Sequence, residues 1–136
     1  MLWSTKNREP YITNELKPKL LQHIEKNAIS KYIHIDTLNC VKDHIHILVI
    51  MKPDQKLSDI IKLIKGESSH WINANKVINF KFEWQDEYFA ASVSESLIDK
   101  VRNYIKNQEE HHRVKTFMDE YKDFIKKLGF EEHNSD

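Results

Sequence analysis

The sequence is poor in the residues that mark disulfide-rich, fibrous or membrane proteins. Its 136 residues include one Cys (Cys40), two Gly and three Pro. A single cysteine excludes an internal disulfide framework and a thiolate metal cluster, and so little Gly and Pro excludes a collagen-like or linker-rich chain. The longest apolar run, residues 47–51, is far too short to cross a bilayer, and the N-terminus lacks the apolar stretch of a signal peptide. We therefore expect a cytoplasmic protein without a membrane anchor.

The chain still has enough apolar material for one compact core. Hydrophobic residues make up 40% and charged residues 31% of the sequence, which is too apolar for a disordered tail. The length indicates one domain over residues 1–136. The net charge is zero, yet residues 1–82 hold 13 Lys/Arg and 8 Asp/Glu, whereas residues 83–136 hold 8 and 13. Neutrality argues against a general polyanion binder, but the split allows a basic face or attraction between the two halves.

The residue pattern predicts alternating strands and helices. Residues 31–40 and 44–51 favour an antiparallel hairpin, and the apolar spacing over residues 58–74 favours a helix. The other predicted elements are a strand end over residues 2–5, a helix over about 14–27, a small hairpin from 80–84 and 89–93, a helix from Ser94 to about 110, and a last helix over about 114–128. This order predicts an α+β fold with helices packed on an antiparallel sheet.

Two histidines separated by one residue, His44 and His46, form the first candidate site. Alternate residues of a strand share a face, so both imidazoles point the same way and supply half of a divalent-metal site. With 8 His in 136 residues, roughly 0.5 such pairs arise by chance. A solvated polar face of a half-exposed strand is therefore the alternative interpretation.

Tyr104 and Gln108 form the second candidate site. Their spacing of four residues predicts a shared face on the helix that starts at Ser94. The Gln carboxamide oxygen is a hard ligand, and the Tyr phenol is a nucleophile once it loses its proton. With His44 and His46, they predict nucleotidyl transfer, in which two imidazoles and a carboxamide hold Mg²⁺ or Mn²⁺ while the phenol attacks phosphorus. The plainer interpretation is an amphipathic tyrosine and a helix-forming glutamine.

The segment over residues 41–49 (VKDHIHILV) resembles the histidine-hydrophobic-histidine strand of the HUH endonucleases. Four more segments occur in the order seen in one branch, the single-tyrosine transposases of the smallest prokaryotic insertion sequences and their REP-associated relatives. These segments are residues 3–8 (WSTKNR), 63–66 (LIKG), 84–88 (WQDEY) and 104–108 (YIKNQ). The resemblance covers nearly the whole chain, and five ordered segments are far more specific than either candidate site alone.

The resemblance implies a ferredoxin-like (RRM-like) antiparallel sheet with packed helices and a homodimer that cuts and rejoins single-stranded DNA beside hairpins. It implies that His44, His46 and Gln108 hold Mg²⁺ or Mn²⁺ and that Tyr104 is the nucleophile, which forms a 5′-phosphotyrosine and a free 3′-OH. It also implies composite active sites, with Tyr104 of one subunit beside the histidines of the other. Such a protein would act in the cytoplasm of a prokaryote, on the nucleoid.

Five basic or polar residues are candidate DNA contacts. Lys6, Asn7 and Arg8 are suited to phosphates or bases of the cut strand, and Lys62 and Lys65 to a hairpin backbone. A solvated loop and a solvated helix face are the respective alternatives.

Other residues have a plainer and a sharper interpretation. We expect Trp71 and Trp84 to be core residues, with base stacking as the alternative. Asp43 is either a simple turn residue or a support for a histidine ligand.

One departure from the family opens a second hypothesis about function. Relatives carry a longer segment before the WSTKNR motif, so we expect a shortened first strand. A catalytically inactive descendant that binds hairpin DNA is therefore the alternative to an active transposase. A metal-binding fold without any nucleic-acid role is the third possibility, because the net charge is neutral.

Overall fold

The computed structural model describes residues 1–108, 122, 126 and 133–134. The predicted helix over about residues 114–128 therefore lies outside the described residues, apart from positions 122 and 126. In chain order the elements are β1 (Leu2–Ser4), the 3-10 turn η1 (Lys6–Arg8), α1 (Leu16–Ser30), β2 (His34–Cys40), β3 (His44–Ile50), α2 (Leu57–Ala74), β4 (Phe89–Ala90), the 3-10 turn η2 (Glu95–Leu97), α3 (Ile98–Lys106) and β5 (His133–Asn134). No helix in the described part is both long and apolar enough to span a membrane.

The strands form one antiparallel sheet in the order β2-β3-β1-β4-β5. The first six regular elements, β-α-β-β-α-β, together with this strand order, are the split βαβ arrangement of ferredoxin-like folds. The predicted α+β class and ferredoxin-like sheet are thus confirmed. β1 is only three residues long, yet it is central, because Leu2 pairs with His46 on one side and with Phe89 on the other.

The longest predicted elements are found close to their expected positions. β2 and β3 form the expected hairpin, and α1 and α2 lie within a few residues of the predicted helices. The Thr13 hydroxyl accepts the backbone N–H of Leu16 at 3.1 Å, which satisfies one of the donors that the first turn of a helix leaves free.

Two local predictions are wrong. The segment over residues 80–84 does not pair with residues 89–93, because Trp84 bridges Thr5 and Phe89 pairs with Leu2. β1 therefore takes the hydrogen bonds that the expected hairpin would have made. The helix predicted from Ser94 to about residue 110 begins as the turn η2, and α3 is interrupted at Asn107 before the helical Gln108. The last two predicted residues, 109 and 110, lie outside the described residues.

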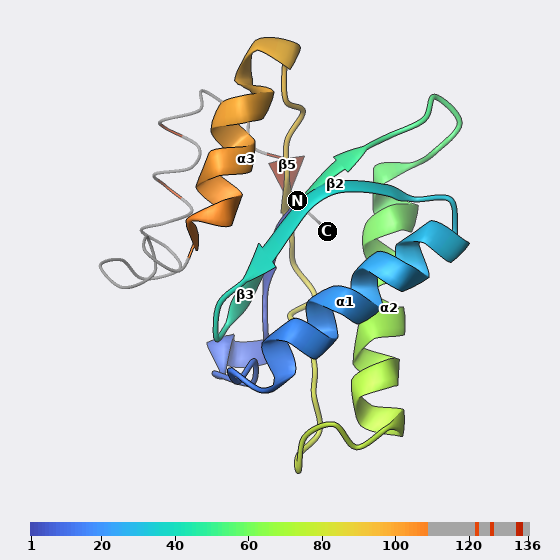
Figure 1. The fold of residues 1–136 in the computed structure, drawn as a ribbon, viewed down its shortest axis with the longest axis vertical. Coiled ribbons are helices and arrows are strands. Elements are labelled where there is room, and N and C mark those ends of the chain that lie inside the picture. The colour runs from blue at the N-terminus through green and yellow to red at the C-terminus, as the bar shows by residue number, and fades with distance from the viewer. Residues whose placement is uncertain (109–121, 123–125, 127–132, 135–136) are drawn as a thin grey trace.

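The helices divide unequally between the two faces of the sheet (Figure 1). α1 and α2 cover one face and enclose the main core, and α3 lies against the other. Side chains of β1 and β3 alternate between the faces, so Trp3, Ile45 and Ile47 enter the main core. The smaller apolar cluster on the α3 face consists of Leu2, Phe89, Val101 and Ile105.

Candidate active site

His44 and His46 lie on β3 and face α3, opposite to the main core. Their exposed fractions are 0% and 1%, and their ring centroids are 5.5 Å apart. The strand alternation that buries Ile45 and Ile47 on one face turns both imidazoles to the other. They are therefore not part of a solvated polar face, and the pair is held in a site that excludes most water.

Asp43 orients the first of these histidines. Its carboxylate Oδ1 lies 2.7 Å from Nδ1 of His44. A carboxylate on one ring nitrogen fixes the imidazole tautomer and leaves Nε2 as the ring nitrogen able to bind a metal. Of the two interpretations of Asp43, the structure therefore favours the one in which this residue orients a histidine ligand.

Tyr104 lies beside the second histidine. The two ring centroids of Tyr104 and His46 are 5.6 Å apart, with an angle of 60° between the ring planes. Both residues belong to the same chain, and Tyr104 is half-buried at the edge of the small apolar cluster. The phenol is thus near the histidine pair and retains access to solvent.

Gln108 follows the end of α3 rather than continuing it. α3 ends at Lys106, and Asn107 has left regular helix geometry, so a break separates the helical Gln108 from the helix that carries Tyr104. Gln108 is nevertheless fully buried. Its Oε1 and Nε2 make no hydrogen bond within the described part of the chain. A buried amide without partners costs free energy, and a ligand on Oε1 would satisfy it.

These donors fit a hard divalent cation. Two imidazoles and one carboxamide oxygen leave positions for water and phosphate, which suits Mg²⁺ or Mn²⁺. The described residues contain no cluster of three or more His, Cys, Asp or Glu that could hold a metal. Among the described residues, Gln108 is the side chain that we consider as a third ligand beside His44 and His46.

The turn η1 carries the three predicted DNA contacts next to the histidine strand. Lys6, Asn7 and Arg8 are exposed, and the preceding Thr5 donates its N–H to the carbonyl of Asp43 at 2.8 Å. Asn7 and Arg8 have φ angles of 56° and 55°, a strained conformation for residues other than glycine. The turn is thus fixed close to His44 by backbone contacts at its base.

Lys62 and Lys65 lie on α2, on the other face of the sheet. Lys62 is exposed, but the Lys65 ammonium donates to the carbonyls of Gln85 and Asp86. Burial lowers the pKa of Lys65, against the opposing effect of the nearby acidic residues. The Gln85 side chain accepts the N–H of Asn7 at 3.2 Å, so Lys65 supports the turn η1 indirectly. A direct DNA contact by Lys62 or Lys65 stays a prediction.

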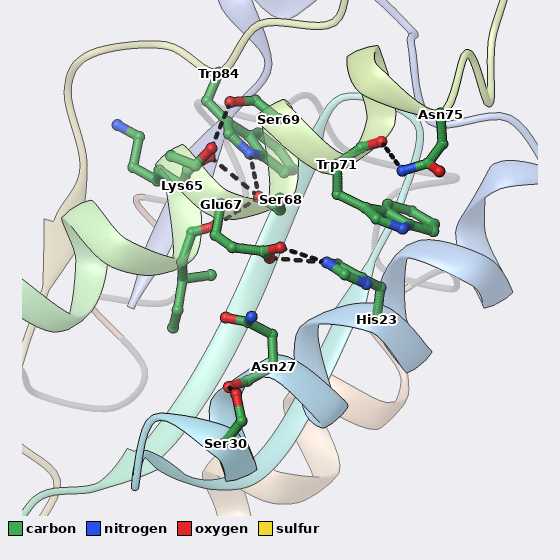
Figure 2. Close-up of polar contacts among 12 residues, drawn as sticks. His23, Asn27, Ser30, Lys65, Glu67, Ser68, Ser69, Trp71, Asn75 and Trp84 are labelled. Carbon is green, nitrogen blue, oxygen red and sulfur yellow. Dashed lines mark hydrogen bonds and ion pairs between the residues drawn. The ribbon is translucent and has the colours of Figure 1, made fainter.

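The α1–α2 side has its own polar contacts (Figure 2). His23 of α1 contacts both carboxylate oxygens of Glu67 at 2.7 and 2.8 Å, and its ring stacks on Trp71 with centroids 4.1 Å apart. Trp84 is buried and donates to the Ser68 hydroxyl at 2.9 Å. The expectation that Trp84 belongs to the core is confirmed, and Trp71 packs on its edge.

Sequence reasoning did not identify the side chains that attach α3 to the sheet. Arg102 of α3 contacts both carboxylate oxygens of Asp36, and Asn39 donates to carbonyls at the end of α3. Polar residues alternating along a predicted strand were the only signal, and this signal does not distinguish a solvated face from one that holds a helix.

Comparisons with known proteins bear on the family and the fold of this chain. The family model of IS200-like transposases matches residues 1–108. The ISDra2 transposase TnpA of Deinococcus radiodurans is 25% identical over 113 residues, which cover 79% of this chain and 81% of that protein. A crystal structure of a candidate transposase from Deinococcus radiodurans R1 has a TM-score of 0.63 and 24% identity, and covers 79% of this chain and 86% of the other. The latter supports the fold.

Proposed function

We propose, since the chain belongs to the family of IS200-like transposases, that it cuts and rejoins single-stranded DNA at hairpin-bearing element ends. In this proposal Tyr104 is the nucleophile, and His44, His46 and Gln108 hold Mg²⁺ or Mn²⁺. The observation that carries the proposal is the position of the half-buried Tyr104 ring, 5.6 Å from the buried His46 ring within one chain.

The proposed reaction is a transesterification at phosphorus. The Tyr104 oxygen loses its proton and attacks the phosphorus, the bond from phosphorus to the 3′ oxygen breaks, and that oxygen leaves as a free 3′-OH. The bound cation would supply Lewis-acid stabilisation of the charge that develops on the phosphate oxygens. Attack by a different 3′-OH on the 5′-phosphotyrosine releases Tyr104 and joins the strands, so the bond energy is conserved without ATP.

Three features of the chain support the individual roles. Asp43 fixes the tautomer of His44, which keeps Nε2 available for the cation. The buried amide of Gln108 has no hydrogen-bond partner within the described residues, as a ligand awaiting its cation would. The exposed turn η1 lies beside Asp43, so Lys6, Asn7 and Arg8 are suited to hold the strand near the site.

The proposed active protein is a homodimer that binds two DNA hairpins. The resemblance to the family implies composite sites, but in this chain α3 already lies against its own β2 and β3. A cis arrangement is therefore favoured. Mixing Tyr104→Phe with His44→Ala protein tests it, because a composite site would restore covalent adduct formation in the mixed dimer, whereas a cis site would not.

The decisive experiment uses labelled single-stranded oligonucleotides with the hairpins that flank the coding sequence. We expect a covalent protein–DNA adduct that requires Mg²⁺ or Mn²⁺ and disappears in Tyr104→Phe. If no element end yields a Tyr104-dependent adduct, the enzyme proposal fails. Hairpin binding that is retained and indifferent to Tyr104→Phe would then identify an inactive DNA-binding descendant.

The salt dependence of hairpin binding tests the third possibility, a metal-binding fold without any nucleic-acid role. Phosphate contacts release counterions, so hairpin affinity should fall steeply with added salt. A protein with no nucleic-acid role would show no such binding at low salt.

A further inference from the structure

α3 is attached to β2 at two points that lie on either side of Tyr104. Before Tyr104, the Arg102 guanidinium donates to both carboxylate oxygens of Asp36, from Nε at 2.8 Å and from a terminal nitrogen at 2.7 Å. After it, the Asn39 amide donates to the carbonyls of Ile105 at 2.9 Å and Lys106 at 3.3 Å. The helix is thus held at both ends of the turn that carries the tyrosine.

A β-bulge in β2 makes these two attachments possible. In a regular strand, Asp36 and Asn39 are three residues apart and would point to opposite faces. The register with β3 shifts between Ile35 and Thr37, so Asp36 is an extra residue. A bulge resets the alternation, and both Asp36 and Asn39 consequently contact α3 while Cys40 enters the main core.

α3 needs such attachments because its apolar contacts are few. It is nine residues long and buries only Val101 and Ile105 among its described side chains. Helices shorter than about 12 residues are only marginally stable by themselves. Two buried apolar side chains alone would do little to prevent α3 from rotating or sliding on the sheet. A bidentate guanidinium–carboxylate pair has a defined geometry. It therefore holds α3 on the sheet and also fixes the position of α3 along β2.

The second attachment also bears on the metal site. Asn39 pairs directly with His46 across the β2–β3 ladder, and it holds the carbonyl of Lys106, two residues before Gln108. It takes up carbonyls that a continuing helix would use, at the point where α3 ends. The strand that carries His46 and the segment that carries Gln108 are therefore joined through one side chain.

We propose that Asp36 and Asn39 are positioning residues for the reaction: Asp36 sets Tyr104 beside His46, and Asn39 sets the chain that leads to Gln108. This inference rests on the proposed function, but its structural part can be measured without DNA. Neither Asp36 nor Asn39 would touch the reacting atoms, because both act through α3.

The test uses variants that change one contact and preserve side-chain size. Asp36→Asn removes the charge facing Arg102. Its matched control is Asp99→Asn, because Asp99 contacts the same guanidinium at 3.1 Å but is exposed and lies on α3 itself. Asn39→Asp replaces the donating amide by an oxygen. Its control is Asn73→Asp, because Asn73 makes a comparable pair of bonds to Phe82 on the other side of the sheet.

The first readout is the ¹⁹F NMR signal of 3-fluorotyrosine at position 104, assigned with Tyr104→Phe, in protein without DNA or metal. We expect this signal to shift and broaden in Asp36→Asn and Asn39→Asp and to stay unchanged in the two controls. The second readout is the single-turnover rate of adduct formation, with a fall of about 10- to 100-fold expected for a displaced nucleophile and unchanged hairpin affinity.

The outcomes separate this inference from the proposed function. If the wild type forms no adduct, the proposed function fails, and the ¹⁹F signal alone decides whether Asp36 and Asn39 hold Tyr104. If both variants match their controls in signal and rate, or if the signal moves while the rate does not, the positioning role is overturned. Should Asn39→Asp fail to fold, Asp36→Asn and Arg102→Gln are compared instead. Because these two changes remove the same contact, the variant that combines them should form the adduct no more slowly than either single variant.

Discussion

The two faces of the sheet are built for different purposes. The face under α1 and α2 buries a continuous apolar core that includes Trp3, Ile45 and Ile47. Among the residues that the structure describes, the cluster on the α3 face has four buried apolar residues. This face also holds two buried imidazoles and is joined to its helix by polar contacts. Stability therefore resides mainly on one face, which leaves the other free to hold groups that a core would exclude.

This division has an energetic reason. Burying an imidazole or a carboxamide costs free energy unless it finds a partner, and such a cost is tolerable only where the fold is secured elsewhere. Variants confined to one face test whether stability and the candidate site are separated in this way.

The largest effect is expected from Tyr104→Phe, which removes one oxygen from the α3 face. It should abolish the covalent DNA adduct, because the phenol oxygen that the proposal assigns as the nucleophile is lost. The free energy of unfolding and the hairpin affinity should change little. Tyr88→Phe is the control, since Tyr88 packs against the main core. Adduct formation by Tyr104→Phe protein, measured on denaturing gels, would contradict the assignment.

Histidine substitutions on the two faces should have opposite consequences. His44→Ala should eliminate Mn²⁺ binding in calorimetry and leave the fold intact. His23→Ala should leave Mn²⁺ binding unchanged and lower the free energy of unfolding by about 1 kcal/mol, because it removes a partly exposed contact to Glu67 and a stack on Trp71. Unchanged Mn²⁺ affinity in His44→Ala would remove His44 from the ligand set.

The same apolar truncation should cost more under α2 than under α3. Ile61 and Ile105 are each 2% exposed, and isoleucine-to-alanine changes in cores cost about 2–5 kcal/mol. We expect Ile61→Ala near the upper end of that range, because its neighbours are packed on several sides. Ile105→Ala should lie near the lower end and also slow adduct formation, since it loosens α3. Denaturant unfolding gives the comparison, and equal costs would mean that the faces contribute equally.

The smallest effect concerns acid stability and again separates the faces. Hydrogen bonding to Arg102 lowers the pKa of Asp36 from 3.8 to about 2, assisted by Thr37 and by the charges of Arg102 and His34, and opposed by burial. The ionised carboxylate thus stabilises the fold above pH about 4, and this contribution is lost as the pH falls through about 2. Unfolding of the wild type should therefore depend more steeply on pH between 4 and 2 than unfolding of Asp36→Asn. Parallel curves would contradict a stabilising contact between Asp36 and Arg102.

Several features of the site followed from local pattern. Alternation along residues 44–51 was sufficient to predict that both histidines share a face, because the period of a strand is two. Apolar spacing was sufficient for α1 and α2. Local pattern failed where a partner distant in sequence intervened: β1 took the pairing expected within residues 80–93, and Asn39 bonds the carbonyls at the point where the helix carrying Tyr104 ends.

The sequence by itself determined most of the order of strands and helices, the α+β class and the residues that carry the candidate chemistry, because periodicity and residue type act over short distances. The ferredoxin-like sheet was implied by the resemblance to a family. Only the tertiary structure decided that the imidazoles are buried, that a bulge turns Asp36 and Asn39 toward α3, and that Tyr104 comes to lie against His46 of its own chain. These depend on the register between strands and on side-chain contacts across more than 60 positions, which no local pattern encodes.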